Sequence, residues 1–159
     1  MSPPIFLPST PRLEEILDKV RDAIALEEPS LLVKNGENVV HRYSWPSELL
    51  VKRNDIKAAM KGIIVKARKK TLVPVRQTSG DLYVGPDEMA IILPIICRKN
   101  LEQAVLETWE EKEDGEILSQ TKTKLEIGFF LIHPSNHYRM PDKVPFIPCF
   151  CHITPAEPE

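Results

Sequence analysis

Histidines and cysteines gather near the C-terminal end of this 159-residue chain, at a spacing that could hold a metal ion. His133 and His137 are four residues apart, and Cys149, Cys151 and His152 follow them. Zinc takes four nitrogen or sulfur ligands in a tetrahedron, and these residues could supply them. The Cys-x-Cys spacing is tighter than usual, and the cysteines could equally be small apolar core residues. We therefore expect no cofactor, with zinc as the alternative.

The second candidate feature is a concentration of positive charge. Between Lys52 and Arg76 there are nine basic residues and one acid, Asp55, for a local charge of +8, although the whole chain carries −2. The nine are Lys52, Arg53, Lys57, Lys61, Lys66, Arg68, Lys69, Lys70 and Arg76. Such a segment attracts phosphate on lipid headgroups or on nucleic acid. It contains no aromatic residue that could stack on single-stranded bases, which favours a lipid surface or a protein.

This charge has two other interpretations. A run of basic residues is often only a solvated face. The segment 101–126 carries eight acids and three bases, so the basic segment of one copy could also pair with the acidic segment of another as a homo-oligomer.

The third candidate is the tetrapeptide Pro8-Ser9-Thr10-Pro11 in a proline-rich N-terminal segment. It resembles the Pro-Ser/Thr-Ala-Pro motifs with which viral matrix and Gag proteins recruit host budding machinery, with Thr10 in place of the alanine. The resemblance implies a protein partner at this end of the chain. A structural interpretation competes with it, because Thr10-Pro11 is also a good helix start.

Catalytic patterns are weak in this sequence. Cys97 with His41 or with His133 could form a nucleophile and base only if the fold brought them together. Cys151 and His152 are adjacent, so their side chains point apart in an extended segment. The six glycines form no phosphate-binding loop. An enzyme is therefore the weaker hypothesis, with any site assembled by the fold.

The elements that must position these residues follow from hydrophobic periodicity. Apolar residues at helical spacing predict an amphipathic helix from about Pro11 to Glu27. Asn35-Gly36 between two apolar runs predicts a hairpin, since both turn positions need positive φ. Strands are predicted over 82–84, 89–96, 117–123 and 125–132, with Pro94 at an edge or a bulge. The stretch 101–113 fits a helix or a strand that places Val105, Glu107, Trp109 and Glu111 on one face; we favour the helix.

The expected fold class is α+β, with one antiparallel sheet of five or six strands packed on the N-terminal helix and one or two short helices. Residues 1–10 are expected to form an extended arm, 11–132 one domain and 133–159 a proline-rich tail. No apolar stretch approaches the roughly 20 residues that span a bilayer. Three cysteines, an odd number, indicate an intracellular, cytoplasmic setting without a disulfide framework.

The function expected from these features is non-enzymatic. A basic anion-binding patch, proline-rich termini and one compact domain suit a structural or interaction protein, such as a small viral matrix-like or accessory protein at a membrane surface. The alternatives are a zinc-stabilised module that binds nucleic acid or a regulatory protein, and a small enzyme with a Cys/His site made by the fold.

Overall fold

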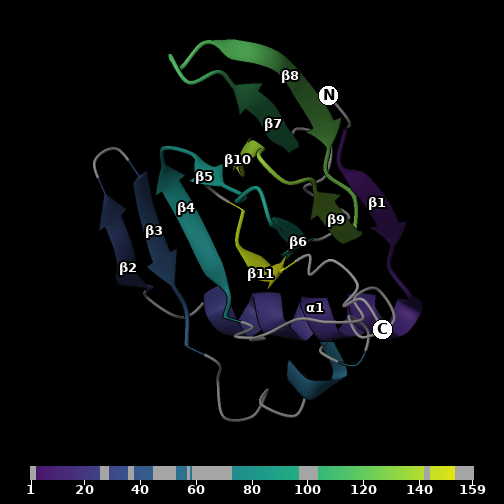
Figure 1. Cartoon of the computed structure of the whole chain (residues 1–159). Helices are drawn as coiled ribbons and strands as arrows, with labels where there is room; N and C mark the ends of the chain where they lie inside the picture. Colours follow the sequence, from purple (N-terminus) through teal and green to yellow (C-terminus); the bar gives the residue numbers. More distant parts are fainter. Residues whose placement is uncertain are drawn as a thin grey trace, which may run out of the picture.

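The computed structural model describes residues 3–25, 29–35, 38–44, 53–56, 58, 73–96, 104–141 and 144–152. Within these ranges the chain forms two antiparallel sheets, of seven and four strands, and a helix, α1, Pro11–Ala25. The two sheets share one apolar core, and α1 lies along the other face of the larger sheet (Figure 1). Among the described residues, no helix has the length and apolar character needed to cross a bilayer.

The larger sheet has the strand order β1-β9-β6-β11-β4-β3-β2. Its strands are β1 Ile5–Pro8, β9 Gly128–Ile132, β6 Glu88–Pro94, β11 Phe146–His152, β4 Val75–Ser79, β3 Asn38–Arg42 and β2 Ser30–Asn35. The predicted hairpin is confirmed, because β2 and β3 pair antiparallel. Asn35 is the last residue of β2, paired opposite Asn38, and is not one of the two turn residues, which lie outside the described ranges.

The smaller sheet has the order β5-β10-β7-β8. Its strands are β5 Leu82–Tyr83, β10 His137–Arg139, β7 Val105–Glu111 and β8 Ile117–Lys124. Strand β10 pairs with both β5 and β7, so it brings residues from three distant parts of the chain side by side.

Strand β6 is buried on both faces and organises the two layers of core. Ala90 and Ile92 belong to the core between the sheets, whereas Ile91 and Leu93 belong to the core that includes α1. All four side chains are fully buried. A strand that is apolar on both faces needs a covering layer on each side.

Helix α1 supplies one of those layers. Its buried residues are Leu13, Ile16, Leu17, Val20 and Ile24, at helical spacing, and they share a cluster with Ile91, Leu93 and Ile147 of the larger sheet. The Thr10 hydroxyl accepts a hydrogen bond from the Leu13 amide at 3.2 Å, which caps the helix.

The expected fold class is wrong. The described chain is mostly β and has two antiparallel sheets, where we expected α+β with a single sheet. Residues 105–111 form strand β7, so the preference for a helix there is also wrong. Pairing with β8 and burial of alternate side chains in the inter-sheet core overcame the local helical spacing.

The proline-rich segments at both ends of the chain contribute strands to the two sheets, which we did not expect. Part of the expected arm, 5–8, is strand β1 paired with β9, and the expected tail contributes β10 and β11. Pro94 ends β6, a strand with neighbours on both sides, and is not at a sheet edge. Pro148 lies inside β11 opposite Ile92 of β6, whereas the pairing of β11 with β4 is at Phe146.

A turn at 79–81 connects β4 of the larger sheet to β5 of the smaller one. Gly80 has φ +84°, and an added Cβ would lie 1.9 Å from Asn38 Oδ1 and 2.7 Å from Asn38 Cα. The Asn38 side chain accepts a hydrogen bond from the Asp81 amide at 2.8 Å. Only glycine combines this backbone conformation with this close approach.

Gly80→Ala should therefore destabilise the protein more than Gly115→Ala. Gly115 has nearly the same φ, +86°, but open space around it, so alanine there costs only the backbone strain of roughly 1–2 kcal/mol. Alanine at position 80 adds a steric cost of about 1–3 kcal/mol. Urea denaturation of both variants measures the difference; equal free energies of unfolding would contradict it.

Thr10→Ala should lower the free energy of unfolding by about 1 kcal/mol, because it removes the helix cap. Thr10→Ser keeps the hydroxyl and should unfold close to the wild type. Thermal unfolding followed by circular dichroism compares the three proteins. An alanine variant as stable as the wild type would show that the capping bond contributes nothing.

Candidate functional site

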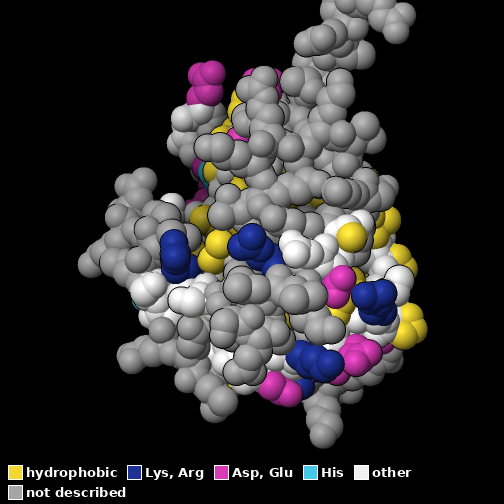
Figure 2. Space-filling model, turned by 90° about the horizontal axis from the view of Figure 1, so that it is seen from below, with side chains coloured by type: hydrophobic (Ala, Val, Ile, Leu, Met, Phe, Trp, Pro, Cys, Tyr) yellow, Lys and Arg dark blue, Asp and Glu magenta, His cyan; other side chains and the backbone are white. Residues whose placement is uncertain are grey.

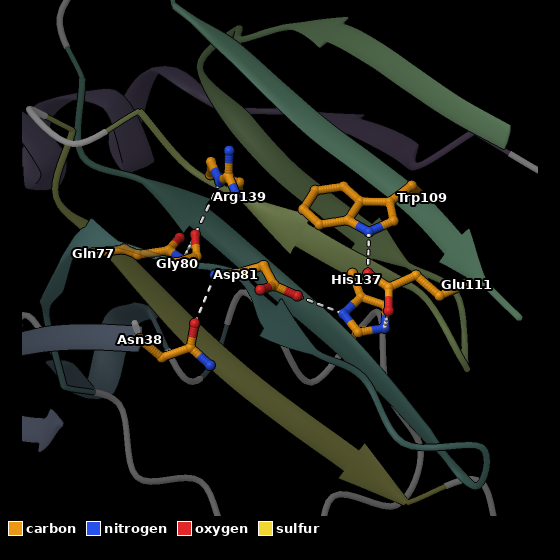
Figure 3. A network of polar contacts seen from close by, with 8 residues as sticks. All are labelled: Asn38, Gln77, Gly80, Asp81, Trp109, Glu111, His137 and Arg139. Atoms are coloured by element: carbon orange, nitrogen blue, oxygen red, sulfur yellow. Dashed lines mark hydrogen bonds and ion pairs between the residues drawn. The ribbon is translucent and has the colours of Figure 1, made fainter. Parts of the chain in front are cut away.

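Two carboxylate side chains and one imidazole, those of Asp81, Glu111 and His137, lie close together at the smaller sheet (Figure 3). One potential ligand atom from each lies within 4.8 Å of the others. His137 Nδ1 is 2.5 Å from Asp81 Oδ2, and its Nε2 is 3.5 Å from Glu111 Oε2. In the described part of the chain this is the one group of three or more such side chains close enough to hold a metal ion.

Strand alternation places this cluster on the face of the smaller sheet that points away from the larger sheet. Tyr138 and Leu106 are fully buried in the core between the sheets. Their neighbours His137 and Glu107 must therefore point to the opposite face. Glu111 is exposed, and Asp81 and His137 are partly buried. The cluster is open to molecules arriving from solution.

Aromatic side chains hold the His137 ring. Trp109, opposite His137 in the β7–β10 ladder, stacks on it with 5.7 Å between ring centroids and 12° between planes. Tyr83, opposite it in β5, is tilted against it at 4.9 Å and remains half exposed. Trp109 also donates its indole N–H to Glu111 Oε1 at 3.0 Å. One side chain thus fixes both the imidazole and the carboxylate.

Asp81 is positioned by the turn that carries it. The Gly80 carbonyl accepts hydrogen bonds from Gln77 Nε2 at 2.7 Å and Arg139 Nε at 2.9 Å. Asn38 holds the Asp81 amide, as described above. The Arg139 guanidinium also lies 5.6 Å from the Trp109 ring centroid, within the range of a cation–π contact. Figure 3 shows these residues as one connected network.

The face of β7 and β10 that points into the core between the sheets carries one pair of polar side chains. Tyr138 lies opposite Thr108 in the β7–β10 ladder, and both are buried. Neither the Tyr138 hydroxyl nor Thr108 Oγ1 has a hydrogen-bond partner. Burial raises the pKa of Tyr138 above its ordinary value, because the phenolate would be desolvated. The phenol is therefore neutral and acts as a core residue.

Four of the five predicted zinc ligands, His133, His137, Cys149 and Cys151, do not come together. Cys149 and Cys151, with sulfurs 4.0 Å apart, are buried in the core cluster that includes α1. His137 is on the smaller sheet, and His133 Nε2 is 3.1 Å from the Pro3 carbonyl oxygen. His152 is the last residue of β11, paired opposite Glu88. Among the described residues, the group that could hold a metal ion is Asp81, Glu111 and His137. It shares only His137 with the predicted zinc ligands.

The basic segment is described only in part. Of its nine basic residues, Arg53 and Arg76 lie within the described ranges; Lys52, Lys57, Lys61, Lys66, Arg68, Lys69 and Lys70 lie outside them. In the predicted partner motif, Pro8 ends β1, the Ser9 amide donates to the Ile127 carbonyl at 3.2 Å, and Thr10 and Pro11 start α1. This tetrapeptide is built into the fold.

Sequence reasoning missed Asp81 and Glu111 as site residues. A signal existed for Glu111, because the strand interpretation of 101–113 places it on one face with Trp109. No signal existed for Asp81, which reads as an ordinary turn residue after Ser79-Gly80. The predicted pairing of Cys97 with His41 or His133 is not tested, because Cys97 lies outside the described residues; His41 is on β3 of the larger sheet.

The comparisons with known proteins concern the fold. No protein-family profile matches the chain, and no curated protein gives a significant match. Among solved structures, the chain is similar to a prolyl-4-hydroxylase from Pseudomonas putida, with 12% identity and a TM-score of 0.51 over 92% of this chain and 89% of that chain. At this identity the likeness shows a shared fold, a two-sheet β-sandwich.

These findings correct the expected function. A hydroxylase fold and an Asp-Glu-His group on one surface contradict the main expectation of a non-enzymatic, matrix-like protein that binds membranes. They favour the alternative of an enzyme whose site is assembled by the fold.

Proposed function

We propose that this protein is a metal-dependent enzyme whose metal is held at Glu111 and His137, with Asp81 as the positioning residue. The observation that carries the proposal is the convergence of Asp81, Glu111 and His137 from a turn and two strands on one open surface. The fold shared with a hydroxylase supports an enzyme and makes iron(II) the favoured ion.

The distances between the side-chain atoms indicate which residues would bind the ion and which one would position a ligand. Two ligands with metal bonds of about 2.0–2.2 Å lie roughly 3–3.5 Å apart around one ion. His137 Nε2 and Glu111 Oε2, at 3.5 Å, match this separation. Asp81 Oδ2 and His137 Nδ1, at 2.5 Å, leave no room for an ion and form a direct hydrogen bond. The donor set therefore fits a divalent cation bound to one imidazole and one carboxylate.

The surrounding residues prepare these ligands. Asp81 accepts a hydrogen bond from Nδ1, which leaves Nε2 as the free ligand atom. The Trp109 indole N–H holds Oε1 of Glu111, which turns Oε2 toward His137. The half-exposed Tyr83 ring offers an apolar surface to a substrate beside the site. With one histidine, the set departs from the two-histidine, one-carboxylate arrangement common in non-haem iron oxygenases.

When bound, ferrous iron would supply the activation of molecular oxygen for hydroxylation of a substrate carbon, with a two-electron co-substrate accounting for the second oxygen atom. The neighbouring hydroxylase acts on prolyl groups by its name, and a prolyl ring is a substrate that would pack on Tyr83.

A second candidate is acid–base catalysis without a metal. The short Asp81–His137 contact favours it, because a carboxylate on Nδ1 leaves Nε2 as a general base. The two candidates differ in whether the protein binds an ion at all.

The test is metal binding by the chelator-treated protein. Titration with Fe²⁺ without oxygen, and with Mn²⁺ or Zn²⁺, should give about one ion per chain and a rise in melting temperature. His137→Ala and Glu111→Gln should remove the binding. Asp81→Asn should weaken it by about 10–100-fold, as expected for a residue that orients a ligand.

Glu110→Gln is the matched control, since it removes the adjacent carboxylate, which lies outside the cluster. It should bind metal like the wild type. A wild-type protein that binds none of the three ions would overturn the metal proposal in favour of acid–base chemistry. Loss of binding in the Glu110 variant to the same degree as in Glu111→Gln would show a general charge effect.

A further inference from the structure

Besides Arg21, which is paired with Asp18 and Asp22, three basic side chains on the α1 side of the larger sheet have a buried nitrogen atom without a hydrogen-bond partner. They are His41 Nδ1, Arg53 Nε and Arg76 Nε. In the described part of the chain, none of the three side chains takes part in an ion pair or a hydrogen bond. Buried polar atoms are nearly always satisfied in folded proteins, so each such atom needs an explanation.

Two of these residues are direct neighbours. His41 of β3 lies opposite Arg76 of β4 in the ladder. Val40 and Val75, next to them in sequence, point into the core between the sheets. His41 and Arg76 therefore both point to the other face, where Tyr43 packs in the cluster that includes α1.

The third residue lies on the same side. Arg53 begins the helical segment 53–56, and Ile56 of that segment is fully buried in the cluster with α1 and Tyr43. The only acid of the segment, Asp55, is already paired with Arg12 at 3.4 Å. Figure 2 views the molecule from this side and shows Lys and Arg side chains distributed over it.

The chemistry of these atoms identifies the missing partner. A guanidinium keeps its charge at any physiological pH and only donates hydrogen bonds. Its Nε and one terminal nitrogen form a fork that matches two oxygens of an oxyanion. Arg53 and Arg76 are partly buried, so solvent screens their charges only in part, and water would satisfy the N–H groups without supplying a counter-charge. A phosphate group has both the charge and enough oxygen acceptors for several donors.

We propose that His41 and Arg76, with Arg53, form a binding site for a phosphate group on the α1 side of the larger sheet. The sequence supports it independently, because the segment 52–76 carries a charge of +8, which raises the local concentration of anions. The site holds one phosphate through buried donors and is therefore distinct from a membrane-binding surface. It lies on a different sheet from the Asp81 cluster and does not depend on the proposed metal.

The test is calorimetric titration of the full chain with inorganic phosphate, at constant ionic strength and with chloride as the reference anion. We expect saturable binding near one phosphate per chain and a melting temperature that rises with phosphate concentration. Arg76→Gln should weaken binding roughly tenfold or more, since a hydrogen bond to a charged group is lost. Arg53→Gln and His41→Ala should each weaken it as well.

Arg42→Gln is the matched control. It removes the same charge from the residue next to His41, but Arg42 is exposed and its side chain points to the other face of β3. It should bind phosphate nearly as the wild type does. If Arg76→Gln does not fold, Arg76→Lys, which keeps the charge and loses the fork, should still bind several-fold more weakly than Arg42→Gln.

Titration with adenosine monophosphate identifies the source of the phosphate. Tighter binding than inorganic phosphate indicates a nucleotide, and equal binding indicates the phosphate group alone; either result supports the site. Absence of saturable binding by the wild type at millimolar phosphate overturns the proposal. Equal affinities of the Arg76 and Arg42 variants overturn it too, because they would show only nonspecific attraction to positive charge.

Discussion

Burial of both faces of strand β6 is the constraint on which the rest of this structure depends. Ile91 and Leu93 require one apolar cover and Ala90 and Ile92 another, and all four are fully buried. Helix α1 covers the first pair, and the smaller sheet completes the core around the second. The chain must therefore build a second sheet from β5, β7, β8 and β10, although its length alone would allow a single sheet under a helix.

The candidate site is a consequence of that second sheet. Strand β10 lies between β5 and β7, and this register sets His137 opposite both Tyr83 and Trp109. The same strand buries Tyr138 inward, so His137 must point outward, where the turn after β4 delivers Asp81. The apolar core fixes the backbone positions of these strands. The polar side chains of the network are therefore placed by the apolar residues next to them in sequence.

The two proposed sites differ in how their polar and charged groups find partners. At Asp81, Glu111 and His137, the two carboxylates and the imidazole contact one another directly, and an ion would replace only the longer contact. At His41, Arg53 and Arg76, each partly buried basic side chain has one buried nitrogen without a hydrogen-bond partner. The first surface forms a hydrogen-bonded network by itself, whereas the second has unpartnered donors and positive charge that a bound anion would satisfy.

The sequence by itself determined the local elements. Helical spacing from Leu13 to Ile24 predicted α1, and Asn35-Gly36 predicted the β2–β3 hairpin, because both signals act between residues close in the chain. Only the tertiary structure decided which strands share a sheet, whether 105–111 is a strand, and which side chains meet. The registers between β5, β7 and β10 join residues far apart in sequence, and no local pattern encodes them. For that reason His137 could be named from the sequence, but its true partners, Asp81 and Glu111, could not.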